Sequence, residues 1–188
     1  MIWFISDLHI NHDQDFVWGL RGFSNVQEMN EAIVARFNSK VKPEDDVYIL
    51  GDILLGELDY TYISRLHGKI HFLIGNHDTK NRIAAYESLG WINLGYATVI
   101  KVPGKIRFYL SHYPTLVSNT TRDRIWGVHG HTHSFNMYQF PKAINVSAEA
   151  LQCYPISLDE LLELIKSDKA MKLLLEVNNN DSSTEVNT

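Results

Sequence analysis

Three histidines alternate with single residues in the stretch GVHGHTHS, at positions 129, 131 and 133. In an extended backbone, residues two apart in the chain point to the same face, so the three imidazoles would meet in one small volume. Neutral imidazoles bind transition metals, but a strand with a His-rich polar face gives the same pattern. A metal site therefore requires partners elsewhere in the chain.

Candidate partners follow other apolar runs. WFIS (3–6), VYIL (47–50) and HFLI (71–74) are predicted strands covered on both faces. The reactive residues come directly after strand runs: Asp7 and His9, Asp52, Asn76 with His77 and Asp78, His112 after KIRFYLS, and His131 and His133 after RIWGV. In open α/β sheets, the loops that leave the C-terminal strand ends build a common crevice. We therefore expect these side chains to share one site.

The chemistry of this set is selective. Imidazoles, two carboxylates and a carboxamide, without a thiolate, suit Mn²⁺, Fe, Zn²⁺, Ni²⁺ or Co²⁺ rather than calcium, and among these we expect manganese. Seven ligands are too many for one tetrahedral ion. They serve two divalent ions well if one carboxylate bridges the ions and positions are left open for water.

Helical patterns lie between the first strands. Ser24 followed by Gln27 predicts a capping box, and an apolar stripe at helical spacing follows it, at Val26, Met29, Ile33 and Phe37. Two further helices are predicted to end at glycines, 60–67 at Gly68 and 82–89 at Gly90.

The second half is predicted to be mainly antiparallel. ATVIKV (97–102), KIRFYLS (105–111), RIWGV (124–128) and AINVS (143–147) are strand-like, without a helix-length pattern between them, and Pro103-Gly104 predicts a hairpin. A final helix should start at Ser157 with Glu160 as its capping partner. We expect one domain over 1–177 and a disordered polar tail over 178–188.

Amino-acid composition and net charge limit the classes of function that we expect for this chain. The chain has 188 residues, 45% of them hydrophobic, and a net charge of −5, which argues against a broad basic face that coats nucleic acid. The single cysteine, Cys153, excludes an intrachain disulfide and suits a reducing cytoplasm. The sequence shows no secretory signal and no apolar window of membrane-spanning length, so we expect a cytoplasmic protein without a membrane partner.

Five blocks, in order, carry a family resemblance: SDLH (6–9), GD (51–52), GNHD (75–78), SHYP (111–114) and GHTH (130–133). Over roughly residues 1–150 the chain resembles the calcineurin-like metallophosphoesterase superfamily. The resemblance implies an α/β fold, a four-layer α/β/β/α sandwich of two mixed sheets. It also implies a first metal held by Asp7, His9 and His133, a second held by Asn76, His112 and His131, and a bridging Asp52.

This assignment leaves His77 free of metal, to act as the general acid. A metal-bridging hydroxide would attack the phosphorus, and His77 would protonate the departing alkoxide. Asp78 is expected either to orient His77 or to cap the following helix. We expect His129 to be a structural histidine packed beneath the site, and His12 to be a solvated loop residue.

The same resemblance limits the substrate. GDILLG lacks the arginine that protein phosphatases of the superfamily carry after GD, and GNHD has Asp where they have Glu, so the small phosphoesterases of bacteria and phages are better models. Ser147 stands where relatives often have glycine. We expect a phosphodiesterase for a small phosphodiester or nucleotide, with nucleic-acid ends still open and the oligomeric state not predicted. The alternatives are a catalytically idle binding scaffold and a single-zinc amide hydrolase.

Overall fold

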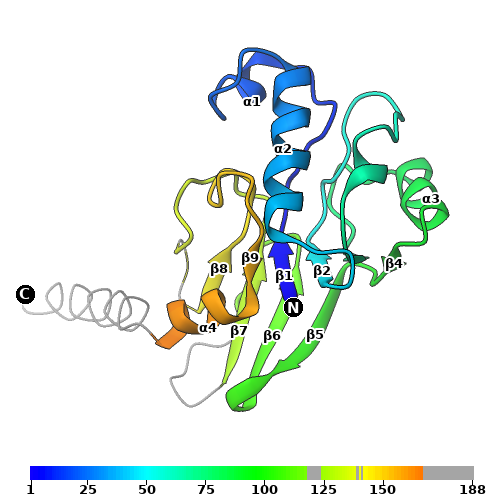
Figure 1. Cartoon of the computed structure of the whole chain (residues 1–188). Coiled ribbons are helices and arrows are strands. Elements are labelled where there is room, and N and C mark those ends of the chain that lie inside the picture. Colours follow the sequence, from blue (N-terminus) through cyan, green and yellow to red (C-terminus); the bar gives the residue numbers. More distant parts are fainter. Residues whose placement is uncertain (118–123, 139, 141, 167–188) are drawn as a thin grey trace, which may run out of the picture.

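Two β-sheets face each other in the computed structural model, which describes residues 1–117, 124–138, 140 and 142–166 (Figure 1). The first sheet has the order β4-β3-β2-β1-β9, with β1 Ile2–Ile5, β2 Asp46–Ile49, β3 Lys69–Phe72, β4 Ile92–Asn93 and β9 Ile156–Ser157. The second has the order β5-β6-β7-β8, with β5 Ala97–Val102, β6 Ile106–Ser111, β7 Ile125–His129 and β8 Ala143–Asn145.

The central strand β1 of the first sheet is buried on both faces, as its apolar run predicts, whereas the edge strand β4 is exposed. Strands β1 to β4 are parallel and only β9 is antiparallel, so the sheet is mixed. Trp3 and Ile5 point into the core beneath the helices, whereas Phe4, between them, points into the core shared with the second sheet. This alternation places one apolar layer on each face of β1.

The second sheet is mixed rather than mainly antiparallel, so that expectation was wrong. The hairpin at Pro103-Gly104 does join β5 and β6 as an antiparallel pair, and Gly104 has a φ of 78°. However, β6, β7 and β8 run parallel to one another. A parallel return needs about a dozen residues but no helix. The segments after Ser111 and after His129 are long enough for such returns.

The helices cover the first sheet. Helix α2 (Val26–Lys40) packs its apolar stripe on β1 and β2, beside α3 (Lys80–Ser88), and α1 (Asp15–Trp18) is one short turn. The cap of α2 lies one residue later than predicted: the Asn25 side chain accepts from the Glu28 N–H, and the Glu28 carboxylate accepts from the Ser24 N–H. Helix α3 ends just before Gly90, which has a φ of 81°.

The helix predicted over 60–67 is not formed. Only a 3₁₀ turn, η1 (Ile63–Arg65), is present there. The Asp59 carboxylate accepts hydrogen bonds from both the backbone N–H and the hydroxyl of Thr61, and such local side-chain bonds compete with helix formation.

Helix α4 (Leu158–Lys166) begins as predicted, because Ser157 and Glu160 form reciprocal hydrogen bonds. It packs beside β9 and β1, and its Leu161 and Leu162 enter the core between the sheets. The two mixed sheets and their flanking helices confirm the predicted fold class. The predicted disordered tail over 178–188 lies outside the described residues.

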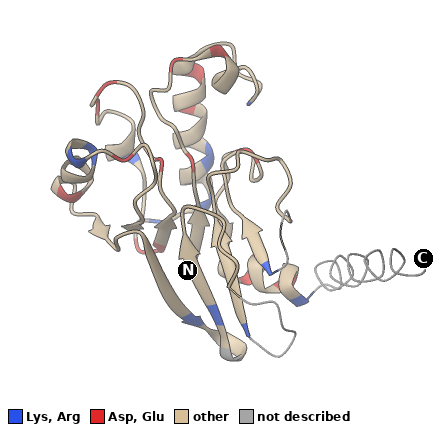
Figure 2. Cartoon of the chain, turned by 180° about the vertical axis from the view of Figure 1, so that it is seen from behind, with Lys and Arg blue, Asp and Glu red and all other residues tan. Residues whose placement is uncertain are grey.

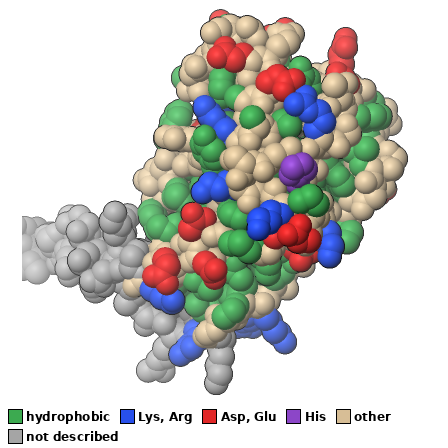
Figure 3. Space-filling view, viewed as in Figure 1, with side chains coloured by type: hydrophobic (Ala, Val, Ile, Leu, Met, Phe, Trp, Pro, Cys, Tyr) green, Lys and Arg blue, Asp and Glu red, His purple; other side chains and the backbone are tan. Residues whose placement is uncertain are grey.

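Charge is unevenly placed over the described chain. Asp and Glu recur on loops and helices at the end where the parallel strands finish, whereas Lys101 and Arg107 lie toward the β5–β6 hairpin (Figure 2). On the face shown in Figure 3, basic, acidic and apolar side chains alternate without a continuous basic area. Such a surface does not favour a long polyanion.

The inter-sheet core depends on Phe108, which is fully buried and meets the Phe4 ring edge-on at 5.9 Å. We expect Phe108→Ala to lower the free energy of unfolding by about 3–5 kcal/mol, because truncation leaves a cavity between the sheets. The matched control Val99→Ala, at an exposed position of β5, should change it by less than about 0.5 kcal/mol. Denaturant unfolding measures both. Equal effects would contradict this account of the core.

Candidate metal centre

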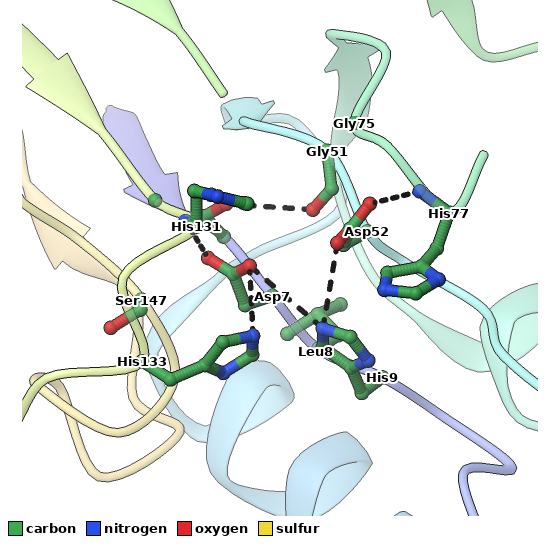
Figure 4. A network of polar contacts seen from close by, with 12 residues as sticks. Asp7, Leu8, His9, Gly51, Asp52, Gly75, His77, His131, His133 and Ser147 are labelled. Carbon is green, nitrogen blue, oxygen red and sulfur yellow. Dashed lines mark hydrogen bonds and ion pairs between the residues drawn. The ribbon is translucent and has the colours of Figure 1, made fainter. Parts of the chain in front are cut away.

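The predicted ligands converge at one end of the sandwich. The loops that follow β1, β2, β3, β6 and β7 meet there, between the two sheets, and Figure 4 shows the side chains of Asp7, His9, Asp52 and His133 pointing toward a common space. Asp7, His9, Asp52 and His112 are almost completely buried. The expectation from strand ends is therefore confirmed as geometry: residues from five separate loops lie together.

Backbone strain is concentrated at this site. Five of the seven predicted ligands have a positive φ: Asp7 56°, His9 49°, Asp52 53°, His131 67° and His133 49°. Each left-handed residue other than glycine costs roughly 1–2 kcal/mol. Such strain persists where the surrounding structure over-determines it, which is typical of functional sites. The loops are thus shaped to aim these side chains inward.

Three glycines let the loops approach closely enough. A Cβ atom on Gly130 would overlap Ser6 Oγ and the Asp7 carboxylate, and one on Gly75 would overlap the Asp52 carboxylate. Gly51 has a φ of 89°, and a Cβ there would strike the backbone of Gly75. The glycines of the GD, GNHD and GHTH blocks are therefore required by contact with the ligands.

The first cluster consists of Asp7, His9 and His133. Asp7 Oδ1 lies 3.8 Å from His9 Nε2 and 3.7 Å from His133 Nε2, and neither Asp7 Oδ1 nor either ring nitrogen of His9 has a hydrogen-bond partner among the described residues. These separations are too long for hydrogen bonds but match ligands that share a cation at about 2.0–2.2 Å. Orphaned buried acceptors of this kind fit a metal ion.

The second cluster consists of Asn76, His112 and His131. The Leu50 carbonyl lies 2.9 Å from His112 Nδ1, so this nitrogen carries the proton and donates, and a neutral ring then presents an unprotonated Nε2. Asn76 Oδ1 lies 2.8 Å from that Nε2 and 3.0 Å from His131 Nδ1. Asn76 Oδ1 and His112 Nε2 are then both acceptors that face each other, and a shared cation would satisfy both.

Asp52 lies between the two clusters. Its Oδ2 is 3.6 Å from His9 Nε2 and 3.4 Å from His112 Nε2, while its Oδ1 accepts the His77 backbone N–H at 2.8 Å. Asp7 also approaches both clusters, but its Oδ2 is already occupied by the His131 N–H at 2.9 Å. One oxygen of Asp52 is thus within reach of both groups of ligands.

The ionisation states of Asp7, His9 and His131 suit cation binding, whereas the hydrogen bond with Glu149 raises the pKa of His133. Burial raises the pKa of the Asp7 carboxyl, but the neighbouring imidazoles of His9, His112 and His133 outweigh burial and lower it. Burial lowers the pKa of His9 and of His131. The carboxylate is therefore charged and these two imidazoles are neutral near pH 7, which are the forms that bind metals.

An ion-pair chain supports the first cluster from behind. His133 Nδ1 lies 3.1 Å from Glu149 Oε1, which the Arg21 guanidinium also contacts, at 2.9 Å and 2.6 Å. Arg21 also donates to the carbonyls of Asp7 and Leu8, at 2.7 Å each. Burial raises the pKa of Glu149, but His133 and Arg21 outweigh it and lower the pKa to about 2. One guanidinium thus fixes both the Asp7 loop and the His133 ring.

Asp78 does not have either of the roles expected for it. Its carboxylate accepts the backbone N–H groups of Asp52 and Gly75, at 2.8 Å each, and the hydroxyl of Tyr86 at 3.0 Å. Helix α3 is preceded by Thr79 without a side-chain cap. Because Asp78 is buried, its carboxylate is used by these two backbone N–H donors. It is therefore not available to the His77 ring or to the N-terminus of α3. It positions the GD and GNHD loops against each other.

The other histidines are placed as follows. The exposed His77 ring lies edge-on to His9, with centroids 5.6 Å apart, and no metal-cluster distance involves it. His12 is not simply solvated: it stacks on His9 at 5.4 Å, and burial and the nearby His9 lower its pKa to about 4. His129 is buried and its Nδ1 donates to the Gly130 carbonyl, as expected for a structural residue.

Sequence reasoning missed Arg21, Glu149 and Tyr86. Glu149 also follows a strand, β8, in the NVSAEA segment, so the strand-end rule could have found it. Arg21 and Tyr86 lie in a loop and a helix, and no motif marks them.

Comparison with known proteins identifies the class. The family model for calcineurin-like phosphoesterases matches residues 1–178, so the chain belongs to that family, as the blocks predicted. The protein is therefore a metal-dependent phosphoesterase by family.

Three proteins to which the chain is similar are matched over most of their length. An uncharacterized protein of Methanocaldococcus jannaschii is 33% identical, with 92% of this chain and 96% of the relative covered. The gene 66 protein of Mycobacterium phage L5 is 30% identical, with 87% and 93% covered. A solved protein of unknown function from Aquifex aeolicus is 27% identical, with a TM-score of 0.64 and 87% and 98% covered. Within the described residues, no helix has the length and apolarity needed to cross a membrane.

The contacts that link Arg21, Glu149 and His133 lead to a testable prediction. Glu149→Gln should weaken divalent-metal affinity roughly 10–100-fold, because the His133 ring loses the carboxylate that orients it. Glu31→Gln is the matched control, since Glu31 is exposed and pairs only with Arg65 on the surface. Calorimetric titration of the metal-free variants with Mn²⁺ measures the affinities, with circular dichroism to check folding. Identical affinities would show that Glu149 does not support the metal ligands.

Proposed function

We propose that this chain hydrolyses phosphodiesters at a centre of two divalent cations, with His77 as the general acid. The observation that carries the proposal is Asp52 Oδ2, a buried carboxylate oxygen within 3.6 Å of one cluster of unpaired acceptors and within 3.4 Å of the other. A single negative oxygen between two groups of lone pairs is the arrangement that a bridging ligand requires.

Seven residues would hold the cations. Asp7, His9 and His133 take the first, Asn76, His112 and His131 take the second, and Asp52 is shared. When bound, a pair of divalent cations lowers the pKa of water and offsets negative charge on the phosphoryl oxygens. All donors are nitrogen or oxygen, which favours manganese over thiophilic ions. The lone reduced Cys153, which is buried in the core, agrees with a cytoplasmic setting.

His77 is suited to donate a proton. Its backbone N–H is fixed on Asp52 Oδ1, and its carbonyl accepts from Arg82 Nη1 at 2.6 Å, so the loop is held at both ends while the ring stays exposed. The ring stands beside His9 without belonging to either cluster. A departing alkoxide needs a proton, and an imidazole held next to the phosphoryl site supplies it.

The surroundings favour a small substrate, such as a simple phosphodiester or a nucleotide derivative. The one face shown in Figure 3 has no continuous basic area, and acidic residues recur in Figure 2 at the end where the parallel strands finish. A long nucleic acid needs many Lys or Arg contacts. Nucleic-acid ends are therefore poorer candidates than small diesters.

Two rival functions are less well supported. An idle scaffold would have no need for five strained ligand residues at one point. A single-zinc amide hydrolase would leave Asn76 and His112 without a role, although they face each other at 2.8 Å.

Asp52→Asn should abolish turnover and reduce bound metal from two ions to one or none, because the shared negative charge is lost while the side-chain shape is kept. Asp46→Asn is the matched control: Asp46 begins β2, the strand that precedes the Asp52 loop, is half-exposed, and contacts His71. Metal analysis and kcat/KM toward bis(4-nitrophenyl) phosphate measure the effect. Two ions and near-normal turnover in the Asp52 variant would refute the bridging role.

His77→Asn should keep both metals but lose roughly 10²–10⁴-fold in kcat/KM on alkyl phosphodiesters. The loss should be clearly smaller on nitrophenyl esters, because nitrophenolate departs without a proton. His67→Asn is the control, since the His67 ring contacts the Val41 carbonyl away from the site. A uniform loss across leaving groups, or no loss, would remove His77 from the mechanism.

A further inference from the structure

An apolar cavity of about 510 Å³ opens beside the first cluster. Its floor includes the rings of His77 and His133, and its walls include Phe16, Leu20, Leu55 and Phe135. The cavity is thus continuous with the candidate centre, although none of its apolar residues belongs to the five family blocks.

Three large apolar side chains in the cavity walls are mostly exposed to solvent. Phe16 is 60% exposed, Leu20 69% and Phe135 63%, so three large apolar side chains stand at one mouth in contact with water. Phe16 and Leu20 belong to α1 and the residues just after it, whereas Phe135 follows His133 in the loop after β7. Apolar side chains that gather from separate segments around a cavity mark a binding site rather than scattered surface residues.

The position of His77 defines which part of a substrate reaches this cavity. His77 lines the cavity, and the proposed function makes it the proton donor to the departing oxygen. The group attached to that oxygen must then lie on the His77 side of the phosphorus. The cavity is therefore placed to receive the leaving group rather than the part of the substrate that stays on phosphorus.

We propose that the cavity binds an aromatic ring carried by the leaving alcohol of a phosphodiester. This inference rests on the proposed function and adds the substrate class. Two exposed phenylalanine rings offer faces and edges to a planar group, and Leu20 and Leu55 complete an apolar surface that a polyol would not match.

The charged residues near the cavity favour a compact substrate that carries a single negative charge. None of the described residues that line this cavity is Lys or Arg. A neighbouring cavity of about 470 Å³ shares His12 and Leu55 with it and carries Asp13, Glu57 and Asp59. A polyanionic chain that left the site on this side would meet those carboxylates, whereas an uncharged aromatic alcohol would not.

The test uses a matched pair of diesters. 2-Phenylethyl methyl phosphate and ethyl methyl phosphate have leaving alcohols of similar acidity and differ in the ring. With the Mn²⁺-loaded protein, we expect kcat/KM for release of 2-phenylethanol to exceed that for release of ethanol by at least about tenfold, since a buried ring adds binding free energy. Calorimetric Kd values for the two analogues in which a CH2 group replaces the leaving-group oxygen, methyl 3-phenylpropylphosphonate and methyl propylphosphonate, should differ in the same direction.

Variants assign this preference to the cavity. Leu20→Ser and Phe135→Ser, both at exposed positions, should reduce the preference in kcat/KM and in Kd to less than about threefold, because each removes part of the apolar wall. Tyr96→Ser, at an exposed position outside the cavity, should retain it.

The outcomes separate the two proposals. If the wild type hydrolyses both esters equally well and binds both phosphonates equally, the cavity proposal is overturned and the phosphodiesterase proposal stands. If the preference is present but survives in both Ser variants, the aromatic group binds elsewhere and the cavity proposal also fails. If the metal-loaded protein hydrolyses neither ester, nor an activated aryl diester, the proposed function itself is wrong.

Discussion

The structure depends on a buried cluster of carboxylate oxygens and imidazole nitrogens that form no hydrogen bonds with one another. Asp7 Oδ1, His9 Nε2, Asp52 Oδ2 and the Nε2 of His112 all point inward, and their mutual distances of 3.4–3.8 Å are too long for hydrogen bonding. Burying unpaired acceptors and charge is costly unless a cation compensates them. The positive φ values, the close-approach glycines and the buried Arg21 are all devices that hold this cluster together before any cation binds.

The proposed metal ligands and the apolar cavity are built by different parts of the fold. The proposed ligands follow strands whose parallel register is fixed by ladders on both sides, so their spacing is set by the sheets. The apolar cavity is instead built by α1 and by the loop after His133, which bear no family block. Loops on a rigid scaffold commonly carry specificity. If both proposals hold, the residues for phosphoryl chemistry and those for the leaving group lie on different segments of the chain.

The sequence predicted the residues that lie next to strands and failed where tertiary contacts decide. Asp7, Asp52 and His131 lie close together, as their positions after strand ends predicted. Asp78 was misassigned, because its neighbours in the chain offer a helix cap while its partners in space, the N–H groups of Asp52 and Gly75, lie in other segments or within its own turn. The role of Arg21 could not be predicted for the same reason, because its partner Glu149 is distant in the sequence.

The direction of β7 and β8 could not be predicted from strand-like runs alone, since an extended segment pairs either way and the connecting loop decides. The helix expected near Tyr60 failed locally, because Asp59 satisfies the backbone and hydroxyl of Thr61 in a turn. Periodicity describes which face is buried. It does not show where a polar side chain accepts hydrogen bonds from backbone N–H groups and so prevents a helix from forming.

The central claim is that Asp52 joins two cations in one centre. Electron paramagnetic resonance of the protein loaded with two equivalents of Mn²⁺ tests it most directly, because ions that share a carboxylate oxygen couple magnetically. We expect an exchange-coupled spectrum, with hyperfine lines more closely spaced than those of isolated Mn²⁺. A spectrum of isolated ions alone, at full occupancy, would contradict the shared centre.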